Sequence, residues 1–243
     1  MIGHAAGVSN YSTLVNNIEQ FRRSDEPVIL ITFNYDTLIE RALSLTFGDF
    51  TFKEIQDYVR RPAYKLFKPR GSVNWGYPIL DDARLNVDQR PESVMNAIID
   101  LADSLRYQSN DFAIMHQPAV LSARHAYFPA ISIPVQKKSH FSCPETWLPF
   151  LEKQLEGVSN LLIIGWRGSE EHFLKMAVPV LSKNAELSIS VVSNTDKSAQ
   201  ETHTLLQSSG LRAAHRYDYL GGFTRFILSD DVKIFLRRGG GVA

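Results

Sequence analysis

Residues 160–193 read NLLIIGWRGSEEHFLKMAVPVLSKNAELSISVVS and carry the clearest indication of the fold class. The runs Asn160–Gly165 and Leu187–Ser193 are short and rich in Ile, Leu and Val, which is typical of strands buried in a sheet. Between them, Glu170–Leu181 spaces its apolar residues at helical intervals. A strand, a helix and a second strand in this order predict a βαβ unit with parallel strands.

The same alternation continues on both sides of this stretch. Further strands are predicted over Val28–Phe33, Tyr64–Lys68 and Arg212–Tyr217. Further helices are predicted over Tyr11–Arg23 (with Ser12 as N-cap), Asp36–Phe47, Asp196–Gln207 and Gly222–Leu228. This rhythm predicts an α/β fold, a Rossmann-like doubly wound parallel sheet with helices on both faces.

The middle of the chain breaks the rhythm. Helices are predicted over Pro91–Leu105 and Cys143–Glu156. Between Arg106 and Lys138 prolines recur without firm periodicity, so we expect short strands and loops there. We therefore expect a single domain over residues 1–243, with an irregular insertion at about 77–140.

Composition narrows the classes of function. Lys and Arg number 26 and so do Asp and Glu, so the formal net charge is zero. This balance makes no strong case for binding nucleic acid or an anionic membrane. With Cys143 as the sole cysteine, neither an intrachain disulfide nor a multi-cysteine zinc site is expected, and no metal is predicted. No signal peptide or membrane helix is recognisable, so a cytoplasmic protein is expected.

In a doubly wound sheet, ligands bind beyond the carboxyl ends of the strands. After the first predicted strand come Asn34 and Asp36. The Asn34 amide can donate and accept hydrogen bonds to a ribose hydroxyl or a water, and ligand contact is the favoured role. Asp36 has two equally weighted roles, namely ligand contact or capping of the following helix.

A second candidate is the turn Gly165–Glu170, which follows a strand and opens a helix. Such a turn can present backbone N–H groups to a phosphate at the positive end of the helix. The signal is weak by itself, because many strand-to-helix turns carry glycine and serine. Arg167 has two roles open, pairing with a phosphate or simple exposure to solvent.

Five segments together resemble one family, the sirtuin-like domains of prokaryotes. They are ITFNYDTLIERAL (31–43), KLFKPRGSVNW (65–75), NLLIIGWRGSEEHF (160–173), VVSN (191–194) and GGFTRFI (221–227). The resemblance runs from about Val28 to Ile227, in the order the family has. No single segment is decisive, and the resemblance rests on all five together.

The resemblance implies a protein that binds NAD as substrate and hydrolyses it to nicotinamide and ADP-ribose, as in bacterial defence against phage. It assigns catalytic roles to Asn34, Asp36 and Arg70. It assigns cofactor contacts to Thr32, Gly71, Ser72, Gly165, Trp166, Arg167, Ser169 and Asn194. Further partners implied are a second copy of the chain or a protein of the same defence system. Lysine deacylation is a weaker expectation, because true sirtuins usually carry a four-cysteine zinc module.

Two departures from the family bear on activity. The family's general base is the histidine before Gly-Ser, and Arg70 occupies that place. Arginine stays protonated in proteins and cannot accept a proton. The glycine-rich phosphate loop of the family is also missing before Val28, either from the protein or because the chain is truncated before Met1. His116, His125 and His172 are weak substitutes for the base, since a lone histidine usually has a packing or surface role.

Three hypotheses therefore remain open. The first is an NAD-hydrolysing domain with an atypical site. The second is a catalytically silent module that binds a nucleotide or a partner protein, which Arg70 and the missing loop favour. The third is a structural α/β subunit. The sequence also leaves the choice between NAD and NADP open.

Overall fold

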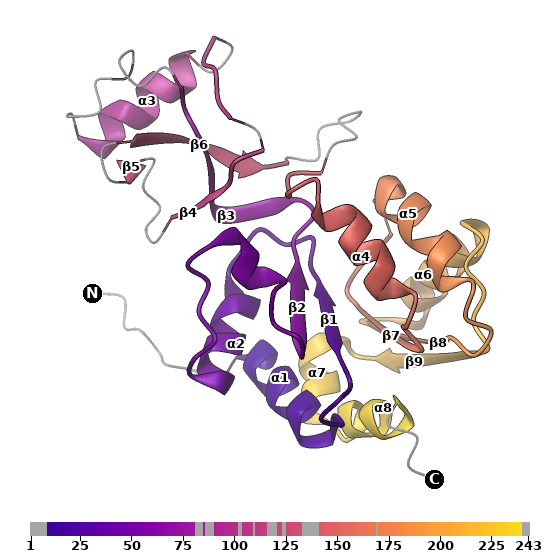
Figure 1. Cartoon of the computed structure of the whole chain (residues 1–243). Coiled ribbons are helices and arrows are strands. Elements are labelled where there is room, and N and C mark those ends of the chain that lie inside the picture. Colours follow the sequence, from indigo (N-terminus) through magenta and orange to yellow (C-terminus); the bar gives the residue numbers. More distant parts are fainter. Residues whose placement is uncertain are drawn as a thin grey trace. The chain divides into compact units, whose positions relative to one another are not determined.

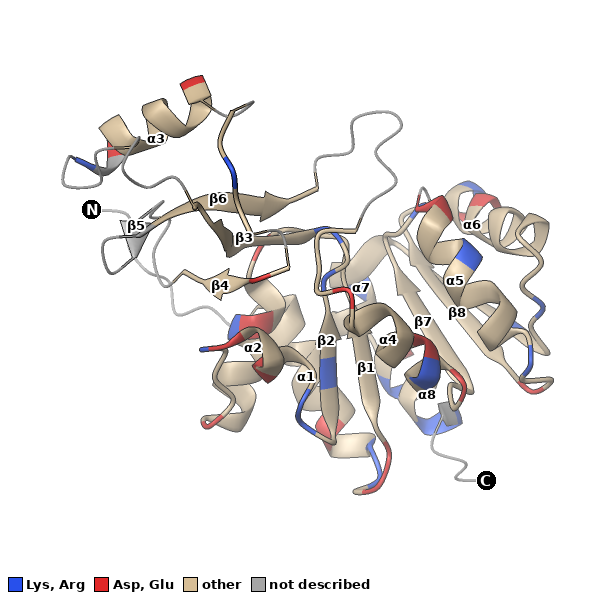
Figure 2. Cartoon of the chain, turned by 45° about the horizontal axis from the view of Figure 1, so that its top comes forward, with Lys and Arg blue, Asp and Glu red and all other residues tan. Residues whose placement is uncertain are grey.

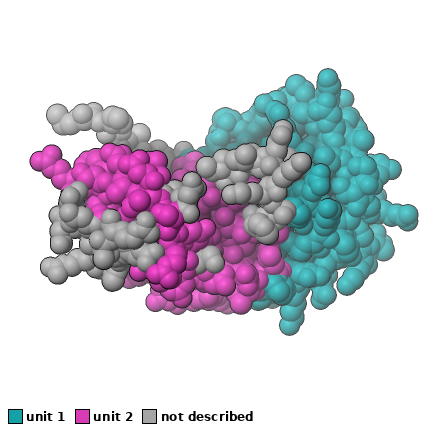
Figure 3. Space-filling model, turned by 90° about the horizontal axis from the view of Figure 1, so that it is seen from above, with its two compact units in different colours: residues 1–26, 41–48, 149–243 teal, residues 27–40, 49–148 magenta. Residues whose placement is uncertain are grey.

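In the computed structural model, the described residues are 9–80, 85, 90–101, 104–108, 110–115, 121–122, 125–132, 141–168 and 170–239. The chain divides into two compact units (Figure 3). Unit 1 comprises residues 1–26, 41–48 and 149–243, and unit 2 comprises residues 27–40 and 49–148.

Unit 1 is built on a parallel sheet. Its strands are β7 (Asn160–Ile164), β8 (Ser188–Ser193) and β9 (His215–Leu220), side by side in that order. Helices α5 (Glu171–Leu181) and α6 (Asp196–Ser208) connect them. The βαβ unit predicted from residues 160–193 is therefore confirmed, and α6 with β9 repeats it.

Helices cover both faces of this sheet. Figure 1 shows α5 and α6 on one face, with α7 (Gly222–Leu228) and α8 (Asp231–Gly239) on the other. Helix α1 (Asn10–Phe21) packs against α7 and α8. Their shared core comprises Leu14, Val192, Tyr219, Phe226, Ile227 and Val232. Since Leu14 lies on α1, the first and last described helices bury apolar surface in one core.

Unit 2 contains a second parallel pair. Strand β1 (Val28–Ile31) pairs with β2 (Tyr64–Phe67) in the register Val28↔Tyr64. Helix α2 (Leu38–Phe47) follows β1 and passes from unit 2 into unit 1 after Glu40, and the 3-10 helix η1 (Ile55–Tyr58) precedes β2. The carboxyl ends of β1 and β2 therefore lie at the same edge of the pair.

The irregular middle segment forms an antiparallel sheet. Its strands stand in the order β4 (Ala113–Ile114), β3 (Gly71–Pro78), β6 (His125–Ile131) and β5 (Leu121–Ser122). Helix α3 (Pro91–Leu101) packs on it through Val94 and Ile98, which share a core cluster with Ala126. The predicted short strands are confirmed, but β3 was not predicted and begins before residue 77.

Several predicted boundaries are corrected. Ser9, and not Ser12, is the N-cap of α1, because the Ser9 side chain accepts the N–H of Ser12. Helix α4 (Trp147–Leu155) begins four residues after Cys143, and β9 begins at His215 rather than Arg212. Helix α8 was not predicted.

The predicted α/β class is confirmed, since parallel strands alternate with helices, an arrangement compatible with a Rossmann-like fold. Acidic and basic positions are interspersed on helices and loops of both units (Figure 2). In the part of the chain that the structure describes, no helix combines the length and the apolar character needed to cross a bilayer.

Candidate functional site

The first group of predicted site residues lies where β1 ends. Thr32 continues the pairing with β2, its N–H donating to the carbonyl of Phe67 at 3.0 Å. The Thr32 hydroxyl in turn accepts the N–H of Asn34 at 3.1 Å. Asn34 is exposed, and its side-chain amide makes no hydrogen bond to a described residue. Its backbone is thus held while its amide remains available to a ligand.

Asp36 makes the contact expected of a helix cap. Its Oδ1 accepts the N–H of Leu38, the first residue of α2, at 3.0 Å. The side chain is half-buried. The capping role weighed for Asp36 therefore has a physical basis, and its ligand contact stays a prediction.

Lys68 is a buried cation directly below this loop. Its ammonium group is fully buried and lies 2.8 Å from Oε1 of Glu40 and 2.7 Å from Oγ of Ser72. It also donates to the backbone carbonyl of Asp36. Burial lowers the pKa of Lys68, and the charge of Glu40 opposes that shift. One ammonium group thereby joins α2, the Asn34–Asp36 loop and the start of β3.

The buried polar contacts continue from Glu40 into an aromatic cluster. The Tyr58 hydroxyl donates to Oε1 of Glu40 at 3.0 Å, and Nε1 of Trp75 donates to the Tyr58 oxygen at 3.1 Å. The Trp75 ring packs edge-on against Trp147, with centroids 5.5 Å apart. Burial raises the pKa of Tyr58, which keeps its hydroxyl protonated. We call Lys68, Glu40, Ser72, Tyr58 and Trp75 the Lys68 network.

The turn from Arg70 to Ser72 lies beside the Asn34 loop. The Ser72 hydroxyl is fully buried, accepts from Lys68 and donates to the carbonyl of Tyr35 at 3.2 Å. Val73 N–H donates to the same carbonyl at 2.9 Å. Arg70 is half-buried, with its Cζ 6.0 Å from the centroid of the Phe33 ring. Unit 2 thus brings Thr32, Asn34, Asp36, Arg70, Gly71 and Ser72 together at the carboxyl ends of β1 and β2.

Gly71 is required by the geometry of this turn. Its φ is +83°, in the left-handed region that favours glycine. A Cβ built there would overlap the backbone oxygen of Ala130 on β6. The contact of Gly71 and Ser72 with a ligand stays a prediction. Their structural role is observed, because Gly71 allows the turn before β3 and Ser72 bonds to the carbonyl of Tyr35 in the Asn34–Asp36 loop.

The second group lies at the carboxyl ends of β7 and β8 in unit 1. Gly165 is exposed, with φ +62°, and its N–H donates to the carbonyl of Val192 at 3.1 Å. Asn194 is exposed and lies against Gly222, where a Cβ would overlap its Oδ1. Arg167 is exposed and makes no ion pair with a described residue. A polar, glycine-rich edge is therefore present where the sequence predicted one.

The Trp166 side chain contacts residues that follow it closely in the sequence. Its Nε1 donates to the carboxylate of Glu170, and its ring packs edge-on against Phe173 with centroids 5.9 Å apart. Ser169, the remaining predicted contact, lies outside the described residues. The predicted site residues thus form two groups, one in each unit.

The weaker candidates are three histidines and Cys143. His172 is exposed at the start of α5. His116 and the His125 side chain lie outside the described part of the chain. Burial raises the pKa of the Cys143 thiol to about 12, so it is protonated at neutral pH and is no nucleophile there. Among the described residues, no group of three or more His, Cys, Asp or Glu is placed to hold a metal ion.

Comparisons with family models and with curated proteins add nothing to the resemblance carried by the motifs. No protein-family model matches the chain, and no curated protein matches it significantly. The sirtuin-like resemblance therefore stays a prediction that rests on five short segments in order.

Proposed function

We propose that this protein binds NAD at the carboxyl ends of its parallel strands and hydrolyses it to nicotinamide and ADP-ribose. The observation that carries the proposal is the exposed side-chain amide of Asn34, which has no hydrogen-bond partner among the described residues, while the backbone N–H of Asn34 donates to the Thr32 hydroxyl after the end of β1. The resemblance assigns further nucleotide contacts to Gly165, Arg167 and Asn194, which belong to unit 1. Defence against phage, the biological setting, follows from the resemblance alone.

The proposed chemistry breaks the bond between the ribose carbon and the nicotinamide nitrogen. Nicotinamide leaves with the bonding electron pair, water adds to the oxocarbenium-like ribose, and a proton passes to solvent. The side-chain oxygen of Asn34 accepts a hydrogen bond from the water or from a ribose hydroxyl, which orients the attack. Arg70 supplies no base, so hydrolysis is slower than in a site that has one, by about 10²–10⁴-fold.

The test is release of nicotinamide from NAD by the purified chain. Asn34→Ala is expected to lower the rate by about 100-fold or more, because an orienting group is lost. Asn160→Ala is the matched control, since Asn160 begins β7 and its amide bonds only to Ser159 among the described residues. Equal rates in the wild-type protein and Asn34→Ala would refute the assignment of Asn34.

A second variant separates the two departures from the family. Arg70→His is expected to raise the rate by about 10-fold or more, because it restores a group that can accept a proton. No gain would point to phosphate binding as the limiting feature.

The alternative function is a catalytically silent nucleotide-binding module, and Arg70 is the observation that favours it. It predicts saturable NAD binding by calorimetry without any nicotinamide release. Absence of both binding and release would refute both functions.

A further inference from the structure

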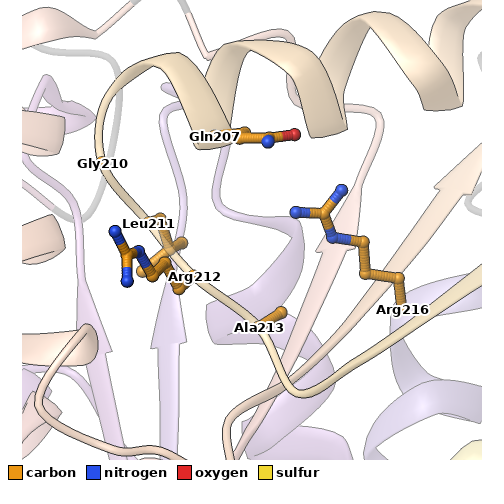
Figure 4. Close-up of a pocket in the computed structure, with 6 residues that line it drawn as sticks. All are labelled: Gln207, Gly210, Leu211, Arg212, Ala213 and Arg216. Carbon is orange, nitrogen blue, oxygen red and sulfur yellow. The ribbon is translucent and has the colours of Figure 1, made fainter.

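A pocket of about 480 Å³ lies in unit 1 at the amino end of β9 (Figure 4). Its lining residues are Gln207, Gly210, Leu211, Arg212, Ala213 and Arg216. Because β7, β8 and β9 are parallel, this is the end of the sheet opposite to Gly165 and Asn194. The volume falls within the range of about 300–1,000 Å³ that is usual for pockets holding small organic molecules.

The charged residues that line the pocket are both basic. Arg212 and Arg216 are exposed, and the lining contains no acidic residue. Neither guanidinium has a hydrogen bond or an ion pair with any residue that the structure describes. In Figure 4 the guanidinium of Arg216 lies at the right, below the end of α6 that carries Gln207, and Arg212 lies at the left. Two uncompensated cations therefore border one hollow.

The acidic residue nearest to Arg216 on the same face of β9, Asp218, already has hydrogen-bond partners. Asp218 follows Arg216 by two residues, so both side chains point to one face of β9. The Asp218 carboxylate lies 2.8 Å from Nε2 of His203 and accepts a hydrogen bond from Gln200 at 3.4 Å. Gln207 stands one helical turn beyond His203 on α6. Asp218 therefore binds side chains of the α6 turn that contains Gln200 and His203. Arg216 faces the following turn, which contains Gln207.

The end of α6 does not compete for the arginines. Gly210, with φ +95°, donates its N–H to the carbonyl of Gln207, and Leu211 donates to that of Leu206. These two bonds form a Schellman cap, which satisfies carbonyls that would otherwise attract cations. The cap also turns the chain sharply and places Arg212 at the rim.

We propose that this pocket binds a small molecule carrying phosphate groups. Guanidinium groups pair with phosphate oxygens through charge-assisted, often bidentate, hydrogen bonds, and the Gln207 amide adds a further donor. Two cations that line one pocket suit an anion with more than one charged group, such as a diphosphate. The inference is independent of NAD hydrolysis, because it uses none of the residues assigned to that reaction.

The test is titration of the full chain with inorganic pyrophosphate at constant ionic strength, followed by calorimetry and by amide NMR shifts. Saturable binding is expected, with the largest shifts at Gln207, Gly210, Leu211 and Ala213. Arg216→Gln and Arg212→Gln are each expected to weaken binding by about tenfold or more, because each removes a charged hydrogen-bonding partner.

Two further variants make the outcome decisive. Lys197→Gln removes one positive charge from the other end of α6, where Lys197 is exposed beside Glu201, and is expected to bind as wild type. Arg167→Gln tests the opposite edge of the sheet. The proposal is overturned if pyrophosphate does not bind, if Lys197→Gln weakens binding as much as Arg216→Gln, or if only Arg167→Gln weakens it. Stronger binding of citrate than of pyrophosphate would overturn the preference for phosphate.

Discussion

At the scale of single residues, the Lys68 network is the feature that sequence reasoning missed. A charged pair that is almost wholly buried costs desolvation, which is offset only when each charge finds good partners. Lys68 has three acceptors, and Glu40 accepts from both Lys68 and Tyr58. Asn34 and Asp36 could be found because polar residues follow an apolar run. Lys68 and Glu40 are 28 residues apart, and no local pattern pairs them.

Removing one charge from this pair should be costly. Lys68→Met leaves the Glu40 carboxylate buried without its cation, and we expect a loss of about 3–5 kcal/mol in the free energy of unfolding at pH 7. The double variant Lys68→Met with Glu40→Gln should recover most of that loss, because the pair is replaced by neutral groups and Tyr58 keeps an acceptor. Urea unfolding followed by tryptophan fluorescence measures both. A single variant as stable as the wild-type protein would contradict the ion pair's role.

At the scale of elements, local periodicity predicted the parallel strands and most of the helices, but it missed β3 and α8. The strands β1, β2, β7 and β8 are apolar runs that can be recognised in the sequence. Their predicted bounds lie within two residues of the observed ones. Strand β3 gave no such signal, because it contains Gly71, Gly76 and Pro78 and because it pairs with β6, a segment that is distant in the sequence. Helix α8 was overlooked although it has Asp231 in its first turn and arginines in its last, a usual helix signature.

The turn that opens β3 gives a prediction at this scale. Gly71→Ala should lower the free energy of unfolding by about 3 kcal/mol or more, because a left-handed φ and a clash with the backbone of Ala130 act together. Gly48→Ala is the matched control. Gly48 also has a positive φ, +66°, but nothing lies within 4 Å of a Cβ there, so about 1–2 kcal/mol is expected. Chemical denaturation of both variants measures the difference, and equal losses would show that the clash is relieved.

At the scale of the whole molecule, contacts divide the chain into two compact units, each made of separate pieces of the sequence. The single domain expected over residues 1–243 stays a prediction. The division depends on packing between segments far apart in the sequence, as when α1 joins α7 and α8. Periodicity reports which face of a helix is apolar, but it does not report which distant helix covers that face. For this reason the elements were predictable and their grouping was not.

Unit 1 can be tested by complementation. A fragment of residues 149–243 lacks α1 and exposes the apolar surface that Leu14 covers. We expect a peptide of residues 9–26 to bind this fragment and to raise its midpoint of thermal unfolding, measured by circular dichroism. The same peptide with Leu14→Ala should raise it less, since one of its buried apolar contacts is lost. Equal effects of the two peptides would show that α1 does not stabilise the core through Leu14.

The position of α1 has a consequence for how the protein is made. Leu14 leaves the ribosome early, while its core partners Phe226 and Val232 are synthesised more than 200 residues later. At about 5–20 residues per second, α1 waits roughly 10–45 s before its apolar face can be buried. During that interval the nascent chain presents an unsatisfied amphipathic segment. Newly made chains are therefore open to chaperone binding or to self-association until Phe226 and Val232 have been synthesised.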